Sequence, residues 1–157
     1  MAWTTSKVFV AFVTARNNGT NATNLSSDTI EGALFDGTIT PDATVSLANS
    51  AYGVGVWSSG HVTDTGSSAP AGWPTLGRPL TSVTSAATSN VYSLGAANLL
   101  SANGVTTITN ANGLLVYDHT VAGDYGVCFL YFGGAQTITL GTVTVAFSGG
   151  NLVQETV

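Results

Sequence analysis

The sequence predicts an all-β fold, mainly an antiparallel β-sandwich or jelly roll, in which the N-terminal segment could form one short helix. The composition favours strands, because Thr, Val, Ser, Ala, Asn and Gly dominate while Glu, Lys, Arg and Gln are scarce. Turn-forming pairs recur along the chain, at 18–19, 36–37, 103–104, 112–113, 133–134 and 149–150. Apolar residues alternate with threonine and alanine over 137–147, with a phase change at Gly141 that indicates a β-bulge.

The N-terminal segment is the ambiguous element. Thr5 or Ser6 could cap a helix over residues 7–16, which the sequence Asn17-Asn18-Gly19 would end. Such a helix would place Val8, Phe9, Phe12 and Val13 on one apolar face. The β-branched residues of the same stretch favour a strand instead. We expect the helix, followed by a polar loop over 17–27.

The remaining elements follow in order along the chain. Expected strands are 29–35, 54–57 with 61–63, 80–85, 90–94, 114–117, 125–132 and 137–147. The connection 42–52 could hold one helical turn, and 64–78 forms a second long loop. At 157 residues, 44% of them hydrophobic, the chain suffices for a single β-rich domain spanning residues 1–157.

Charge is the most unusual property of the chain. Only 7% of the residues are charged, against roughly 25% in ordinary soluble domains. Since few solvated charges keep neighbouring molecules apart, we expect a surface that is covered by protein partners. Three basic residues and a net charge of −5 exclude a nucleic-acid groove and a binder of acidic membrane surfaces. No apolar run approaches the roughly 18 residues of a membrane helix.

The residues that could carry chemistry are few and dispersed. Asp118-His119 could begin a catalytic triad, but the sequence has no Gly-x-Ser-x-Gly motif. Two histidines and Cys128, which lies in an apolar run and is expected to be buried, fall short of a zinc site. The acidic residues are interpreted mainly as turn formers. We therefore expect neither an enzyme nor a cofactor.

Aromatic residues are the candidate contacts with partners. Trp3, Trp57 and Trp73 fall in predicted termini or loops, and tryptophan is enriched at the centres of interfaces. Phe9 and Arg78 complete the predicted interface set. Core packing is the alternative for Trp57 and Trp73, and a brace for its own loop is the alternative for Arg78.

Several sequence fragments appear in an order that resembles a known group. They are Lys7-Val8-Phe9, Thr29-Ile30-x-x-Ala33-Leu34, the stretch 38–43 (TITPDA), Ala51-Tyr52, the loop 72–80 (GWPTLGRPL), the stretch 111–118 (ANGLLVYD), Phe132-Gly133-Gly134, and 141–147 (GTVTVAF). In this order the chain resembles the head decoration, capsid cement and minor capsid proteins of tailed phages that infect actinobacteria. The resemblance spans most of the chain.

This resemblance implies a β-sandwich-like module on the outer surface of a virion capsid. Its expected partners are the major capsid protein and other copies of itself, which could form a closed ring such as a trimer. It would be made in the host cytoplasm, since the first residues lack the features of a signal peptide. A phage tail, fibre or collar component stays open as an alternative. So does a carbohydrate- or receptor-binding β-sandwich, in which Trp57 and Trp73 would stack on sugar rings.

Overall fold

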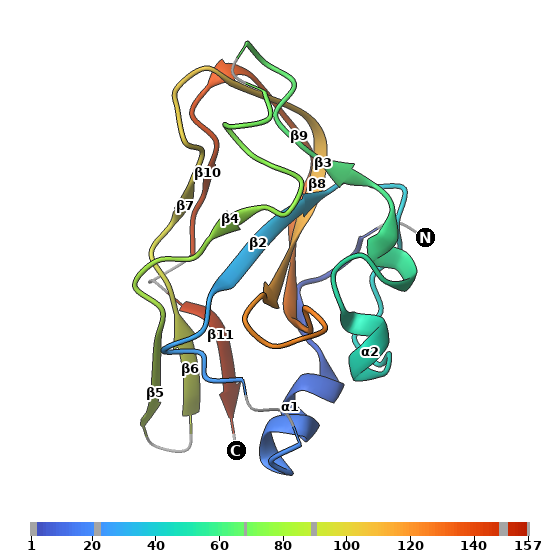
Figure 1. The fold of residues 1–157 in the computed structure, drawn as a ribbon, viewed down its shortest axis with the longest axis vertical. Coiled ribbons are helices and arrows are strands. Elements are labelled where there is room, and N and C mark those ends of the chain that lie inside the picture. Colours follow the sequence, from blue (N-terminus) through green and yellow to red (C-terminus); the bar gives the residue numbers. More distant parts are fainter. Residues whose placement is uncertain (1–2, 21–22, 68, 89–90, 148–150, 157) are drawn as a thin grey trace.

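The chain folds mainly into antiparallel β-sheet, as predicted, in a computed structural model (Figure 1). The structure describes residues 3–156 except 21–22, 68, 89–90 and 148–150. The strands are β1 Lys7–Val8, β2 Ile30–Phe35, β3 His61–Val62, β4 Arg78–Pro79, β5 Thr84–Thr88, β6 Val91–Gly95, β7 Leu99–Leu100, β8 Thr106–Asp118, β9 Gly126–Gly141, β10 Thr144–Val145 and β11 Asn151–Thr156. The helices are α1 Val10–Asn17, α2 Leu47–Ser50 and the 3-10 turn η1 Gly55–Ser58.

The strands form three sheets, of which one organises the molecule. The main sheet has the order β1-β9-β8-β2-β3, and β4 also pairs with β2. A two-stranded sheet, β10-β7, and a three-stranded sheet, β11-β6-β5, complete the set. In Figure 1 these smaller sheets and the two short helices lie on opposite sides of β2.

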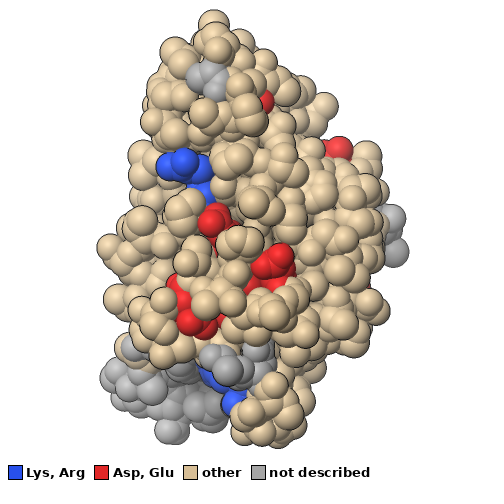
Figure 2. All heavy atoms as spheres, in the orientation of Figure 1, with Lys and Arg blue, Asp and Glu red and all other residues tan. Residues whose placement is uncertain are grey.

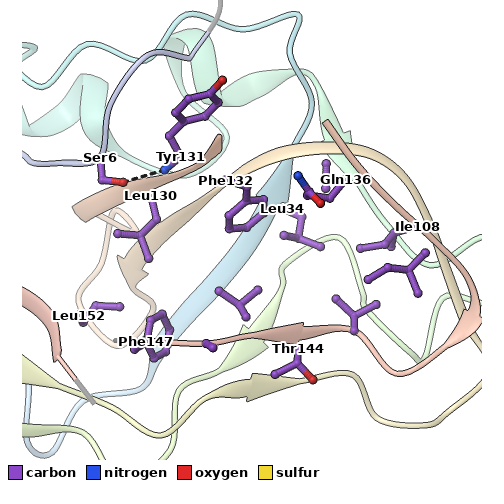
Figure 3. A pocket seen from close by; sticks show the side chains of 15 residues that line it. Ser6, Leu34, Ile108, Leu130, Tyr131, Phe132, Gln136, Thr144, Phe147 and Leu152 are labelled. Atoms are coloured by element: carbon purple, nitrogen blue, oxygen red, sulfur yellow. Dashed lines mark hydrogen bonds between the residues drawn. The ribbon is translucent and has the colours of Figure 1, made fainter. Parts of the chain in front are cut away.

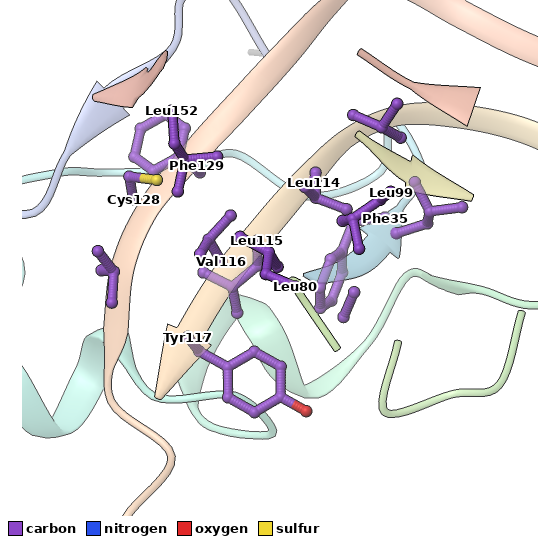
Figure 4. Close-up of a cluster of buried hydrophobic side chains, with 14 of the residues drawn as sticks. Phe35, Leu80, Leu99, Leu114, Leu115, Val116, Tyr117, Cys128, Phe129 and Leu152 are labelled. Atoms are coloured by element: carbon purple, nitrogen blue, oxygen red, sulfur yellow. The ribbon is translucent and has the colours of Figure 1, made fainter. Parts of the chain in front are cut away.

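The core fills both faces of the main sheet. Consecutive residues of β8 point to opposite faces, yet the stretch 114–117 is fully buried (Figure 4). On one face, Leu99 of β7 packs against Gly32 and Leu114. On the other face, the N-terminal segment, α2 and η1 cover the sheet. The predicted strand over 114–117 is therefore the last part of a longer strand, and this part is buried on both sides.

The N-terminal segment, for which the sequence allowed either a helix or a strand, contains one of each. Lys7 and Val8 form β1 and pair with Phe129 and Cys128, so the helix begins only at Val10. Neither Thr5 nor Ser6 caps it, because Phe9 occupies the N-cap position without a side-chain hydrogen bond. The helix ends at Asn17, within the predicted stop signal.

Other predicted elements need correction. Residues 54–57 are not a strand: η1 covers most of them, and positive φ angles at Gly53 (77°) and Gly55 (56°) break the extended backbone. The expected helical turn in 42–52 is present as α2. The strand expected over 80–85 is displaced to β5, and the one expected over 90–94 is matched by β6, although Asn90 lies outside the described residues.

Loop 64–78 is held to the main sheet by one buried carboxylate. Asp64 Oδ1 accepts hydrogen bonds from the backbone N–H groups of Gly66 (2.8 Å) and Thr107 (2.9 Å), and Oδ2 accepts one from Gly72 (3.1 Å). The backbone of Asp64 also donates to the carbonyl of Trp73, at 2.9 Å. A long loop is thereby fixed on β8 with Trp73 beneath it.

Candidate interaction surfaces

The aromatic residues predicted to face partners are buried in the core instead. Trp57, Trp73 and Phe9 are 0% exposed, and Trp3 is 3% exposed. Trp3 and Phe9 make edge-on contacts with Trp57, with ring centroids 5.8 and 6.1 Å apart. A side chain without exposed surface cannot anchor a partner, so the interface prediction is wrong for these four residues. The alternative, core packing, describes Trp57 and Trp73.

Arg78, the fifth predicted interface residue, stays partly accessible. It lies in β4 opposite Gly32 of β2, and its side chain is half-buried. Its Nε atom is buried without a hydrogen-bond partner among the described residues. Whether it contacts another subunit stays a prediction.

Glu31, the neighbour of Gly32, lies in a small polar cluster. Burial raises the pKa of Glu31, and the nearby positive groups of His119 and Arg78 offset part of that rise. In register, Glu31 sits opposite Tyr117. The ring of Tyr117 stacks on that of Tyr52, with centroids 4.8 Å apart. We call Glu31, Tyr52, Arg78, Tyr117, His119 and Asp124 the Glu31 cluster.

The catalytic triad that Asp118 and His119 could have begun is not formed in this cluster. Asp118 does not orient His119, because its Oδ1 accepts from the backbone N–H groups of Thr120 (2.9 Å) and Val121 (3.3 Å) and so closes a turn. The partner of His119 is Asp124, with 2.8 Å between Nδ1 and Oδ1. No described serine hydroxyl shares a hydrogen bond with His119. The arrangement is a His–Asp pair at the surface, without the nucleophile that acyl transfer needs.

The described part of the chain shows neither an accessible nucleophilic cysteine nor a cluster of metal ligands. Cys128 is 1% exposed, as the sequence predicted, and burial raises the pKa of its thiol, which disfavours the reactive thiolate. No three His, Cys, Asp or Glu residues within the described ranges are grouped to hold a metal ion. None of the described helices is long and apolar enough to cross a membrane.

An apolar groove of about 400 Å³ lies between the main sheet and the chain that follows β9 (Figure 3). One wall comes from the sheet, with Leu34, Ile108 and Leu130, and the opposite wall comes from the stretch 143–147. Phe132, Gln136 and Ile138 of β9 line the groove as well. None of the described residues that line it is charged, so the groove suits an apolar occupant.

Exposed apolar side chains gather at the end of the molecule where β8 begins and β9 ends. Leu140 is 62% exposed, Leu100 is 51% exposed and Val105 is 44% exposed. Val105 and Leu140 flank the pair formed by Thr106 and Gly141, and Leu100 of β7 is paired with Thr144 just beyond. We call these three residues the apolar tip. Local sequence could not reveal it, because Leu140 is distant in the sequence from Leu100 and Val105.

Charges are sparse over the surface as a whole. The chain has three basic and eight acidic side chains, eleven in all, and two of them, Asp64 and Asp118, are buried. At most nine charged side chains are therefore distributed over an accessible surface of 7260 Å². That is about one charge for each patch of roughly 800 Å², the area that one partner contributes to a standard interface. Figure 2 shows one face on which a few charged groups gather near the middle and the rest of the area is almost uncharged.

Comparisons with protein-family models, with curated proteins and with solved structures gave no match to this chain.

Proposed function

We propose that this chain is a virion structural protein that decorates the outer surface of a tailed-phage head and stabilises it by bridging major capsid protein subunits. The sequence resemblance suggests the assembly. The physical support is the surface, which combines very few charges with an exposed apolar tip. The apolar groove, whose walls are mostly buried side chains, opens beside the half-buried residues of β9. Exposed apolar patches are typical of sites that other proteins cover.

Sparse charge suits this role for an energetic reason. Charged side chains lose hydration when a partner covers them, and that loss is repaid only by accurate pairing. A surface of threonine, serine and small apolar groups avoids most of this desolvation. Cementing also engages several neighbouring subunits at once, so modest contacts add through their high effective concentration.

Quantitative mass spectrometry of purified particles and separated heads tests the proposal. The expected result is a copy number similar to that of the major capsid protein, in the head fraction. Particles that lack the chain should release their genome at a lower temperature than complete particles. Absence from the particle would contradict the proposal.

A tail, fibre or collar component is the second candidate, because the same uncharged surface would serve any permanent assembly. It predicts a far lower copy number in the tail fraction. The carbohydrate-binding alternative loses its main argument, since Trp57 and Trp73 have no exposed ring to stack on a sugar.

A further inference from the structure

Part of the outer edge of β9 pairs with no other strand among the described residues. Near its start, β9 is covered on this edge by β1, and the N–H of Tyr131 donates to Ser6 Oγ at 2.9 Å. Beyond that point, over residues 133–141, β9 pairs with β8 on one side through Gln136, Ile138 and Gly141, and has no strand on the other side among the described residues. Their side chains are exposed or half-buried. We call residues 133–141 the β9 edge.

Loop 64–78 does not cover this edge. It binds the opposite edge of β8, where Thr107 donates its N–H to Asp64 Oδ1 and accepts a hydrogen bond from the N–H of Thr65 at 2.8 Å. The stretch of β8 that pairs with the β9 edge is thus covered on its far side. On the β9 edge itself no described strand pairs with the outward-facing backbone, which favours the addition of another strand.

The edge lacks two of the features that normally prevent strand addition. Natural edge strands are protected by charged side chains, especially lysine, by proline or by β-bulges. No charged residue occurs between Asp124 and Glu155, and no proline occurs after Pro79. The third feature, β-bulges, is present: the β8–β9 register shifts along this stretch, and positive φ angles occur near its ends at Gly133, Gly134 and Leu140. The five residues between Gly134 and Leu140 carry no such kink.

The β9 edge is continuous with the apolar groove and the apolar tip. Gln136 and Ile138 belong to the edge and also line the groove. Leu140, the most exposed of the large apolar side chains described, lies on the edge and in the tip. A strand added here would therefore extend the sheet and also cover apolar surface.

We propose that two copies of this chain associate through the β9 edge, which pairs with itself in antiparallel register about a two-fold axis. A neutral edge requires a neutral strand, because a partner's charge would lose hydration without finding a counter-charge. The chain supplies such a strand, and self-pairing creates no like-charge repulsion. Thr137 and Thr139 add cross-strand pairs of a favourable kind, and the same surface patch serves both copies, as a two-fold interface requires.

The inference deepens the proposed function and rests on it, since it names the surface that one copy offers to the next. Sedimentation analysis of the purified chain tests it directly. The wild type is expected to have twice the 15.8 kDa mass of one chain. Thr139→Lys places a charge at an exposed edge position without a side-chain hydrogen bond, and should weaken the dimer by about tenfold or more.

Ala122→Lys is the matched control. It adds the same charge at an exposed position in the turn before β9, at the other end of the strand, and should leave the dimer intact. Thr139→Glu provides a second variant. Thr139→Lys and Thr139→Glu should each be monomeric alone and should form a mixed dimer when combined, which loss of folding could not produce.

A monomeric wild type would overturn the proposal and would leave the edge to a strand of a different protein. A dimer or trimer that persists in both Thr139 variants would also overturn it, because the copies would then meet elsewhere. Binding of the variants to heads is a separate readout. A monomeric Thr139→Lys chain that still binds heads would support self-pairing at this edge and would leave the proposed function standing.

Discussion

At the scale of single residues, Asp64 shows how an acidic residue can serve structure. The sequence placed it among turn-forming carboxylates, whereas in the structure it is 2% exposed and receives three backbone N–H groups from three segments. The two more distant segments, at Gly72 and Thr107, are joined only by folding. Its role could not be predicted from local sequence.

Replacement of Asp64 by alanine should destabilise the fold strongly. It would leave buried N–H groups without acceptors, and each lost hydrogen bond to a charged group is worth about 1.5–3 kcal/mol. We expect a loss of roughly 3–4 kcal/mol in the free energy of unfolding, measured with urea. Asp42→Ala is the control, because Asp42 makes similar turn contacts with Thr44 in a fully exposed position. A loss no larger than that of the control would contradict the structural role.

Glu31 gives a prediction about pH. Because burial raises its pKa in the folded state, folding favours the protonated carboxyl. The associated stability is fully present below the ordinary pKa of 4.5 and is lost as pH rises through the folded-state value. The free energy of unfolding of Glu31→Gln, relative to that of the wild type, should therefore be higher at about pH 7 than at about pH 4. Unfolding free energies at several pH values test this.

The opposite slope for Glu31→Gln would mean that the charges of Arg78 and His119 outweigh the desolvation of Glu31. The glutamate would then be a partner in a stabilising ion pair. Arg78→Met measured over the same pH range would show whether that pairing is the cause.

At the scale of elements, the long β8–β9 pair explains the main sequence-based errors. Asn112-Gly113 and Gly133-Gly134 read as turns, but both lie inside these strands. The register shifts between Ala111, paired with Gln136, and Gly113, paired with Tyr131. The two turn signals therefore mark one bulged region, and only the pairing of distant segments reveals it.

Gly113 should be intolerant of any side chain. A Cβ atom there would collide with the ring of Trp3 and the carbonyl of Leu130. We expect Gly113→Ala to lower the free energy of unfolding by about 1–3 kcal/mol, measured by chemical denaturation. Gly104→Ala is the matched control, since its Cβ would make only an ordinary contact, 3.5 Å from Thr142 Oγ1. Equal effects of the two substitutions would show that Trp3 does not pack against β8 as described.

The elements that the sequence did predict are those defined by local pattern. The strand over 29–35 and the apolar run over 125–132 correspond to β2 and the first half of β9. Alternation over 143–147 matches the burial of Val143, Val145 and Phe147. The aromatic residues were misplaced because tryptophan in an irregular segment can be buried by any element that folds over it, and no local pattern records that.

At the scale of the whole molecule, the chain exposes about as much surface as a compact monomer of its mass. Its accessible surface of 7260 Å² is close to the roughly 7300 Å² expected for a monomer of its mass. Exposed apolar residues therefore do not reflect an incomplete core. The sequence predicted a surface poor in charge, but the groove, the β9 edge and the apolar tip became visible only when separate segments met.

Hydroxyl-radical labelling of the apolar tip tests most directly whether protein partners cover this surface. Side-chain oxidation of Leu140, Leu100 and Val105 would be compared between the dilute isolated chain and intact particles. We expect strong labelling in the isolated chain and clear protection in the particle. Equal labelling in both, with exposed Val54 as an internal reference, would contradict the account.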